Sequence, residues 1–423
     1  MYKKTILSNG LTVATHQMSG RVSVSLGIWI RAGARYERKG IAGISHFLEH
    51  ILFKGTKRRT CEEIKQDIEG LGGSLNAFTG KESTCYLSRV RRKHFNSALD
   101  VLADMVLNAK LAPEDIETER KVILEEIRMY KDLPGHFVMD CLTSLLWPNQ
   151  PLGMNTAGEV SSVGSITRDQ LFAYKQSSYG LNNIVIVVCG SLEHKQVLEE
   201  CKKCFSSAAK KIRLKKFSMV SEKQSAPQLN CQVKDTEQTH LALGLHGLAN
   251  AHPERFALAL LHTILGANMS SRLFRQLREE RGLAYEIGTA VRFFQDTGAF
   301  VVHAGIDSCR TVEAVELILE QLRQLKEQEV GKQELARAKE YCTGQLLLAL
   351  EDTSDYMLWL GESVVYKRKF LAPAQIIQRL RQVTADDLRR LANKIFQDRR
   401  LNLALIGPIK GKEKQIKKGL SLK

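Results

Sequence analysis

The sequence has no hydrophobic run near the roughly 20 residues that a membrane-spanning helix needs. Its opening residues, Met1–Gly10, also lack the apolar core of a secretory signal peptide. The nine cysteines are scattered and odd in number, a pattern typical of reduced thiols and not of a disulfide framework. Cys201 and Cys204 have no second ligand pair, so a metal or redox role there is disfavoured. We therefore expect a cytoplasmic protein without a membrane span.

Acidic residues are fewer than basic ones, 46 against 62, which gives a net charge of +16. Most of this excess lies in two segments, residues 201–220 and residues 410–423. No module of alternating aromatic and basic residues accompanies either segment, as nucleic-acid binding would require. We therefore interpret the charge as a solubilising linker and a flexible basic end, and nucleic acid as an improbable partner.

The length of 423 residues predicts two domains, and an internal repeat supports this. Each half begins with β-type alternation, passes through helices and ends in a helix followed by a strand. This order predicts an α+β fold of two homologous domains, each a mainly antiparallel sheet with helices packed on one face. We place the domains at residues 1–210 and 228–423, joined by a basic stretch. Five pairs of identical residues recur 217 positions apart: Gly27 and Gly244, Thr167 and Thr384, Asp169 and Asp386, Leu171 and Leu388, Gly190 and Gly407.

A short helix is predicted from Ala42 to Phe53, with Gly55 closing it. One of its faces is apolar, and the opposite face carries His46, Glu49 and His50. Two histidines one helical turn apart can bind a single metal ion, and a neighbouring carboxylate can act on water. Alone, this motif is also compatible with an ordinary solvated face.

A second helix is predicted from Pro113 to about Lys131. Glu119 and Glu126 are two turns apart and lie within its apolar stripe, where a carboxylate is costly unless a cation meets it. Arginine or lysine could supply that cation, but the His-x-x-Glu-His helix makes a metal the better partner. We predict one Zn²⁺ per chain, held by His46, His50 and Glu126, with Glu119 orienting a ligand. The expected stripe contains Ile116, Val122, Ile123, Ile127 and Tyr130.

Taken together, three motifs resemble the pitrilysin/insulinase-type zinc peptidases, which carry the inverted motif. They lie at 43–56, at 119–127, and at 270–274 with 281–285, and the similarity is greatest to the mitochondrial processing peptidase and its bacterial relatives. The resemblance implies that the two domains form half of a clamshell, closed by a second chain in a homodimer or heterodimer. It also implies that the second half lacks its own zinc site, so we expect His262 to be a structural histidine on a helix face.

Residues 72–80 read as a glycine-flanked strand followed by a second strand at 82–90. This pair is either an ordinary hairpin or an edge that recruits a peptide by β-augmentation. The resemblance points to Asn76 and Ala77 as the substrate-binding residues of this strand. It also points to Arg278 and Tyr285, the latter near the developing oxyanion, with Arg281 as a weaker candidate for the arginine.

The predicted function is zinc-dependent endopeptidase activity on peptides or unfolded polypeptide segments inside a chamber, with Glu49 as general base. The main alternative is a noncatalytic partner or structural subunit of the same fold. That alternative is disfavoured because such subunits commonly lack part of the ligand set, which is complete here. A basic nucleic-acid-binding protein is the second alternative.

Overall fold

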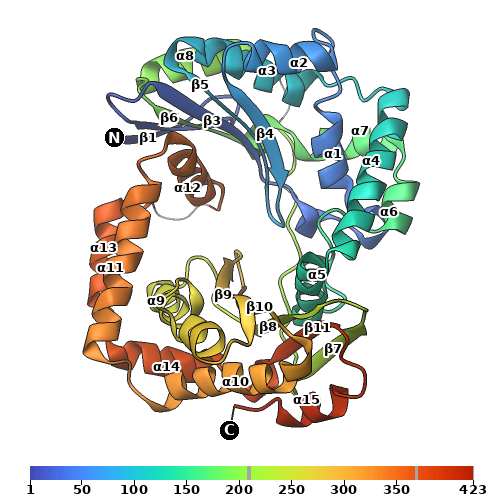
Figure 1. The fold of residues 1–423 in the computed structure, drawn as a ribbon. Helices are drawn as coiled ribbons and strands as arrows, with labels where there is room; N and C mark the ends of the chain where they lie inside the picture. Colours follow the sequence, from blue (N-terminus) through green and yellow to red (C-terminus); the bar gives the residue numbers. More distant parts are fainter. Residues whose placement is uncertain (207–210, 367–369, 423) are drawn as a thin grey trace. The chain divides into compact units, whose positions relative to one another are not determined.

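The computed structural model describes residues 1–206, 211–366 and 370–422, which form two compact units (Figure 1). The last residues of the expected first domain, 207–210, lie outside the described part of the chain. Among the helices that are described, none combines the length and apolar character that crossing a membrane requires. The first unit comprises Met1–Arg128, Met154–Ser218 and Leu348–Phe370, and the second comprises Met129–Gly153, Met219–Leu347 and Leu371–Lys423.

The first unit is built on a six-stranded sheet in the order β1-β2-β6-β3-β5-β4. Only β2 and β6 run parallel, and the other neighbours are antiparallel. Strand β4 pairs with β5 alone, so the predicted hairpin is present and β4 is an edge of the sheet. The strands are β1 (Tyr2–Ile6), β2 (Thr12–Gln17), β3 (Ser23–Ile30), β4 (Ser74–Thr79), β5 (Thr84–Arg91) and β6 (Ile184–Gly190).

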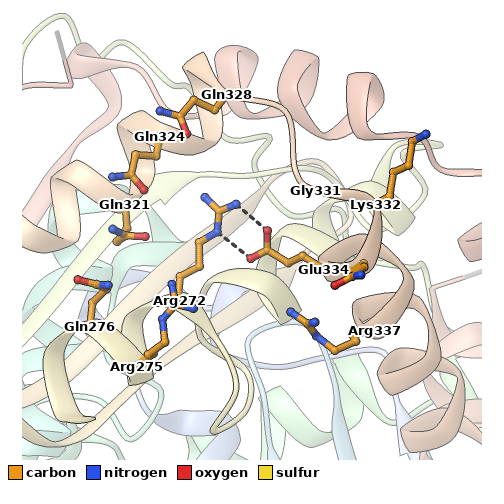
Figure 2. Close-up of a pocket in the computed structure, with 11 residues that line it drawn as sticks. Arg272, Arg275, Gln276, Gln321, Gln324, Gln328, Gly331, Lys332, Glu334 and Arg337 are labelled. Atoms are coloured by element: carbon orange, nitrogen blue, oxygen red, sulfur yellow. Dashed lines mark hydrogen bonds and ion pairs between the residues drawn. The ribbon is translucent and has the colours of Figure 1, made fainter. Parts of the chain in front are cut away.

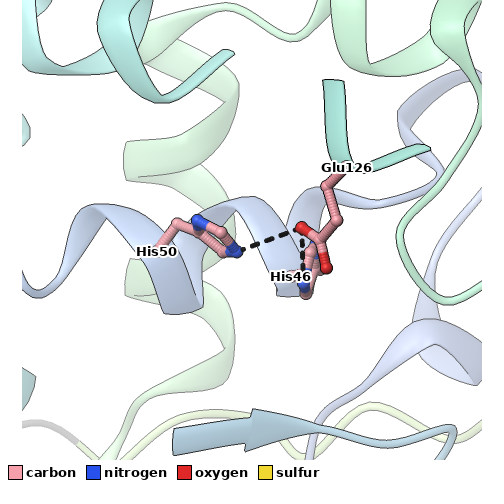
Figure 3. A group of neighbouring side chains, drawn as sticks. All are labelled: His46, His50 and Glu126. Atoms are coloured by element: carbon pink, nitrogen blue, oxygen red, sulfur yellow. Dashed lines mark ion pairs between the residues drawn. The ribbon is translucent and has the colours of Figure 1, made fainter. Parts of the chain in front are cut away.

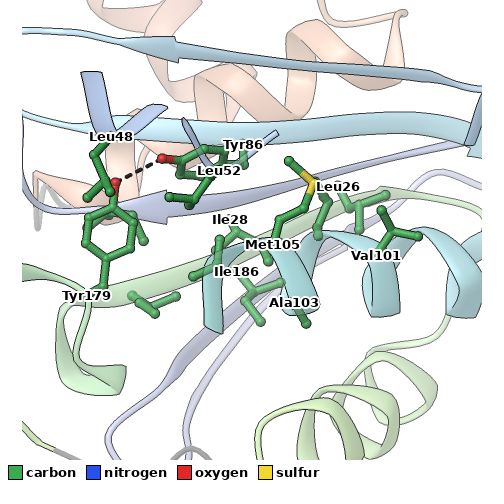
Figure 4. Close-up of a cluster of buried hydrophobic side chains, with 14 of the residues drawn as sticks. Leu26, Ile28, Leu48, Leu52, Tyr86, Val101, Ala103, Met105, Tyr179 and Ile186 are labelled. Atoms are coloured by element: carbon green, nitrogen blue, oxygen red, sulfur yellow. Dashed lines mark hydrogen bonds between the residues drawn. The ribbon is translucent and has the colours of Figure 1, made fainter. Parts of the chain in front are cut away.

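A layer of helices covers one face of this sheet and encloses the first core (Figure 4). Leu26 and Ile28 of β3 face Met105 of α3, and the hydroxyls of Tyr86 and Tyr179 form a 2.9 Å hydrogen bond within the core. The helices are α1 (Ile44–Ile51), α2 (Cys61–Glu69), α3 (Phe95–Asn108), α4 (Pro113–Asp132), α6 (Val160–Ser165), α7 (Arg168–Ser178) and α8 (His194–Cys204).

The second unit repeats this plan with a five-stranded sheet in the order β7-β11-β8-β10-β9, in which only β7 and β11 are parallel. The predicted fold class is therefore confirmed. The strands are β7 (Gln228–Val233), β8 (Gln238–His246), β9 (Ala284–Phe293), β10 (Gly298–Asp307) and β11 (Asn402–Gly407). The helices are α9 (Arg255–Gly266), the π-helical segment η6 (Phe274–Glu280), α10 (Thr311–Glu327), α11 (Lys332–Ala349), α13 (Pro373–Gln382), α14 (Ala385–Ile395) and α15 (Glu413–Gly419).

In addition to the expected helix layer, each sheet carries one helix on its other face. Helix α12 (Thr353–Val365), from the second half of the sequence, packs on β3 and β6 of the first unit. Helix α5 (Pro134–Leu146), from the first half, packs on β8 and β11 of the second unit. A Cβ atom on Gly27 would lie 2.6 Å from Met357 Sδ of α12, and one on Gly244 would lie 2.8 Å from Leu142 Cδ1 of α5. These two glycines, 217 residues apart, thus each leave room for the helix that packs on their strand.

The other repeated residues are also structural. Thr167 and Thr384 each cap a helix, α7 and α14, with a reciprocal hydrogen bond to the third helical residue. Gly190 and Gly407 end β6 and β11 with φ values of +146° and +157°, which favour glycine. The repeat therefore indicates that the two units share the same fold.

The expectation of a flexible basic end is wrong for residues 411–422. These residues form α15 and a short extension, in which Ile416, Leu420 and Leu422 are buried in the second core. Their apolar side chains anchor the segment while Lys414, Lys417 and Lys418 face solvent, which a count of charges does not detect. The basic linker is also anchored, because the Phe217 ring lies 3.9 Å from the guanidinium of Arg35.

Candidate metal centre

Helix α1 carries the two histidines predicted to bind the metal, and its start is fixed by a residue outside it. Glu37 accepts hydrogen bonds from the backbone N–H groups of Gly43 (2.7 Å) and Ser45 (2.8 Å). Gly43 has φ +92°, which favours glycine, and a Cβ there would lie 2.4 Å from the Ala157 carbonyl oxygen. The helix therefore begins at Ile44 and ends at Ile51, shorter than the predicted 42–53. Sequence analysis missed Glu37, although an acid close before a helix start is a recognisable signal.

The predicted ligand set converges on one point (Figure 3). Oε2 of Glu126 lies 3.5 Å from His50 Nε2 and 3.7 Å from His46 Nε2, and the three ligand atoms lie within 4.8 Å of one another. Neighbouring ligands of a tetrahedral zinc with bonds of 2.0–2.1 Å are about 3.4 Å apart. Across the described ranges, no other three His, Cys, Asp or Glu side chains converge in this way.

The hydrogen bonding of these side chains supports a metal. Buried Oε2 of Glu126 and buried Nδ1 of His46 have no hydrogen-bond partner among the residues that the structure describes. A carboxylate oxygen aimed at two ring nitrogens without a hydrogen bond is costly unless a cation joins them. The donor set of two imidazoles and one carboxylate is that of catalytic zinc, with a position left open.

Helix α4 supplies the carboxylates from the predicted stripe, with one correction. Ile116, Ile123 and Ile127 are buried as expected, whereas Val122 is 47% exposed. At 3.6 residues per turn, Val122 lies about 120° around the helix from Ile116, outside the stripe. Glu126 is half-buried and reaches the histidines.

Glu119 is buried beside the ligands and not among them. Its Oε2 lies 3.0 Å from His50 Nδ1, and its Oε1 pairs with Lys54 Nζ at 2.6 Å. The first contact turns His50 Nε2 towards Glu126, as the orienting carboxylate of a metal-bound histidine does. The ion pair with Lys54 shows that a lysine is one cationic partner of Glu119, which is the alternative that the sequence left open for these carboxylates.

The pKa values suit cation binding. Burial, reinforced by the neighbouring His50, lowers the pKa of His46 to about 4, so its ring is neutral and can act as a ligand. Burial lowers the pKa of His50, but the hydrogen bond to Glu119 and the negative charges of Glu119 and Glu126 outweigh this and raise it to about 9. The contact with His50 lowers the pKa of Glu126, which stays anionic. A bound metal would replace the proton on His50.

Glu49 lies on the same face of α1 but outside the ligand set. Its Oε2 accepts a 2.5 Å hydrogen bond from the hydroxyl of Thr79, the last residue of β4. Burial raises the pKa of Glu49, while Thr79 and His50 lower it. The role of Thr79 was not predicted, although residues 72–80 had been identified as a strand.

The remaining candidate residues occupy two places. In the first unit, Asn76 is exposed on β4, and its Oδ1 accepts from the backbone N–H of Ala77 at 2.8 Å. In the second unit, the guanidinium of Arg278 lies 4.7 Å from the ring of Tyr285, which is 75% exposed. The competing Arg281 lies 3.6 Å from Glu313.

His262 is a structural histidine, as predicted. Its Nδ1 forms a 2.7 Å hydrogen bond with the hydroxyl of Thr289, which joins α9 to β9. Burial lowers the pKa of His262 to about 4, so the ring is neutral.

Comparisons with known proteins agree with this geometry. Residues 12–160 match the insulinase family, peptidase family M16, and residues 165–342 match the inactive domain of the same family. An uncharacterized zinc protease of Mycobacterium leprae is 35% identical over 412 residues, covering 97% of this chain and 92% of the relative. An uncharacterized zinc protease of Bacillus subtilis is 35% identical over 411 residues, covering 96% and 98%.

Two solved structures share the fold. A protease from Helicobacter pylori superposes with a TM-score of 0.90 at 24% identity, covering 96% of this chain and 99% of that one. A structure from Pseudomonas fluorescens described as a peptidase M16 inactive domain gives a TM-score of 0.89 at 20% identity, covering 96% and 98%. At these identities the likeness supports the fold alone.

Proposed function

The chain belongs to peptidase family M16, the insulinase family, and is a zinc metalloprotease; we propose that it is an endopeptidase with Glu49 as general base. Its substrates would be peptides or unfolded polypeptide segments, cleaved inside a chamber. The observation that carries this proposal is the convergence of His46, His50 and Glu126 next to Glu49, a carboxylate outside this set.

Zinc, when held by these three residues, supplies a Lewis acid that acidifies water and polarises the peptide carbonyl. Glu49 takes the proton of the attacking water on its carboxylate and then donates that proton to the nitrogen of the leaving amine. The burial that raises the pKa of Glu49 favours this return of the proton near neutral pH. Glu119 holds His50 in the ring orientation that the metal needs.

The substrate class follows from the open edge of β4. An extended peptide can add to this edge through backbone hydrogen bonds that do not depend on sequence. We propose that Ala77 offers its backbone N–H and that Asn76 releases it and bonds the peptide backbone with its side-chain amide. Folded proteins lack free extended segments, so unfolded chains and peptides are the expected substrates.

We also propose that Arg278 and Tyr285 assist catalysis, on the basis of the family resemblance and of their exposed stacked pair. Tyr285 would donate to the developing oxyanion, so Tyr285→Phe should lower kcat and leave KM unchanged. An unchanged kcat would contradict this role.

The active particle is proposed to be a dimer, homomeric or with a related chain, in the cytoplasm. Analytical ultracentrifugation of the full chain should give twice the chain mass if it is a homodimer. A monomer in ultracentrifugation that is fully active without any added chain would contradict the dimer. Recovery in a membrane or secreted fraction would contradict the location.

Replacing Glu49 tests the central proposal. Glu49→Gln should retain one zinc per chain and lower kcat on a peptide library by at least about a hundredfold, because the base no longer accepts a proton. Glu125→Gln is the matched control, since Glu125 is an exposed glutamate on α4 that pairs with Arg128 and not with the histidines. Full activity in Glu49→Gln would contradict the proposal. A zinc-loaded wild type without activity would support the noncatalytic alternative.

A further inference from the structure

A polar cavity of about 650 Å³ lies in the second unit, between η6, α10 and the start of α11 (Figure 2). Gly331 apart, each residue of its lining carries a charge or a side-chain amide. Such a lining repels apolar ligands and offers many hydrogen-bond donors. The lining has four cationic residues, one acid and five glutamines, including Arg272, Arg275, Lys332, Arg337, Glu334 and Gln321.

The positive charge of this cavity is largely uncompensated. Its one acid, Glu334, is bound at both oxygens by Arg272, at 2.7 and 2.8 Å, in the middle of the cavity (Figure 2). Lys332 and Arg337 are exposed and have no ion-pair partner in the described part of the chain. Arg275 has only a 3.4 Å contact with exposed Glu280. The bidentate pair fixes Arg272 and leaves a net positive wall around it.

A buried amide also points into the cavity. Gln321 of α10 is 6% exposed, lines the cavity, and has no hydrogen bond to any residue that the structure describes. The amide atoms of Gln321 are not cut off from solvent, so the amide can offer a donor and an acceptor to a ligand in the cavity. The first backbone N–H groups of α11 lie in the same wall, since its first helical hydrogen bond runs from Leu335 to Gly331.

We propose that this cavity binds a small phosphorylated molecule, a site separate from the peptidase centre in composition and chemistry. Phosphate oxygens accept from guanidinium, ammonium, amide and helix-start N–H groups, which are the donors assembled here. A metal cation is disfavoured because the one carboxylate is already paired. A nucleic-acid strand is disfavoured because the lining has no aromatic side chain on which bases could stack.

Calorimetric titration of the full chain with inorganic tripolyphosphate tests this proposal. We expect saturable binding of one tripolyphosphate per chain, at constant ionic strength. The double variant Lys332→Gln/Arg337→Gln should weaken binding by at least about tenfold, because two charge-assisted hydrogen bonds are lost. The double variant Arg379→Gln/Lys414→Gln changes two exposed cations of the same unit outside the cavity and should bind within about twofold of wild type. Both positions in the first variant are exposed, so folding is not at risk.

A second variant and a competitor complete the test. Gln321→Met keeps the volume of the side chain, removes the amide and should weaken tripolyphosphate binding while leaving peptide cleavage unchanged. The proposal is overturned if binding does not saturate, if both double variants bind equally, or if a single-stranded oligonucleotide displaces tripolyphosphate at lower concentration than ATP does. Because the readout is binding, its failure is distinguishable from a failure of the peptidase proposal.

Discussion

Thr79 and Glu49 join the edge strand β4 to helix α1: the hydroxyl of Thr79, at the end of β4, donates a 2.5 Å hydrogen bond to Oε2 of Glu49 on α1. The strand proposed to hold the substrate therefore ends at a residue that is hydrogen-bonded to the proposed base. A peptide added along β4 would run towards Glu49 without any other element having to position it.

Removing the Thr79 hydroxyl should shift the pH dependence of catalysis. Thr79→Val keeps the shape but loses the donor that lowers the pKa of Glu49, so that pKa rises. The acidic limb of the kcat/KM profile should then move to higher pH, and the rate at neutral pH should fall about five- to tenfold. Thr79→Ser retains the hydroxyl and should restore the wild-type profile. Identical profiles for Thr79→Val and wild type would show that this hydrogen bond does not tune the base.

Zinc affinity should depend on Glu119. Glu119→Gln removes the negative charge that orients His50 and pairs with Lys54, and it should weaken zinc binding by about 10- to 100-fold. Competition with a chromophoric chelator measures this directly. Glu117→Gln is the control on the same helix, because Glu117 is exposed and contacts Arg120 instead of the ligands. Equal affinities in the two variants would remove Glu119 from the site.

Glu37 should make stability depend on pH. Burial raises the pKa of Glu37 from 4.5 to about 7, so between these values the folded chain retains a proton that the unfolded chain has lost. Wild-type stability should therefore fall as pH rises through this window. Glutamine does not titrate in this window, so Glu37→Gln lacks this loss of stability. Between pH 4.5 and about pH 8, the free energy of unfolding of wild type should therefore fall by about 3 kcal/mol relative to that of Glu37→Gln.

Urea unfolding of both zinc-free proteins across this pH range measures the difference. The other titrating groups are common to both proteins and cancel. A constant difference at every pH would mean that Glu37 has the same, ordinary pKa in the folded and the unfolded chain.

Substrate affinity should depend on the backbone N–H of Ala77. Ala77→Pro removes this donor on an edge strand, a position where proline is tolerated. KM for an extended peptide should rise about fivefold, the value of one backbone hydrogen bond, with zinc content and kcat little changed. Ala77→Gly keeps the N–H and serves as the control. An unchanged KM in the proline variant would indicate that peptides do not pair with β4 at this residue.

Local sequence pattern was sufficient to predict that His46, His50 and Glu126 come together. Two histidines at i and i+4 share one face of their helix. Glu119 and Glu126, two turns apart, share the apolar face of theirs, where a carboxylate needs a cation as partner. The 217-residue repeat likewise predicted the duplicated α+β fold, because Gly27, Gly190 and their counterparts occupy positions where a side chain would clash or strain the backbone. These features depend on helix and strand geometry, which is encoded within a few neighbouring residues.

Tertiary structure decided the features that depend on residues distant in sequence. The exchange of α5 and α12 between the halves and the contact of Thr79 with Glu49 join segments 30 to 330 residues apart. The same is true of Gln321, which lines a cavity that exists only because α10, η6 and the start of α11 pack together. Sequence periodicity predicts on which face of its helix or strand a side chain lies. The pKa of a carboxylate and its hydrogen-bond donor depend on which faces pack together in the folded chain.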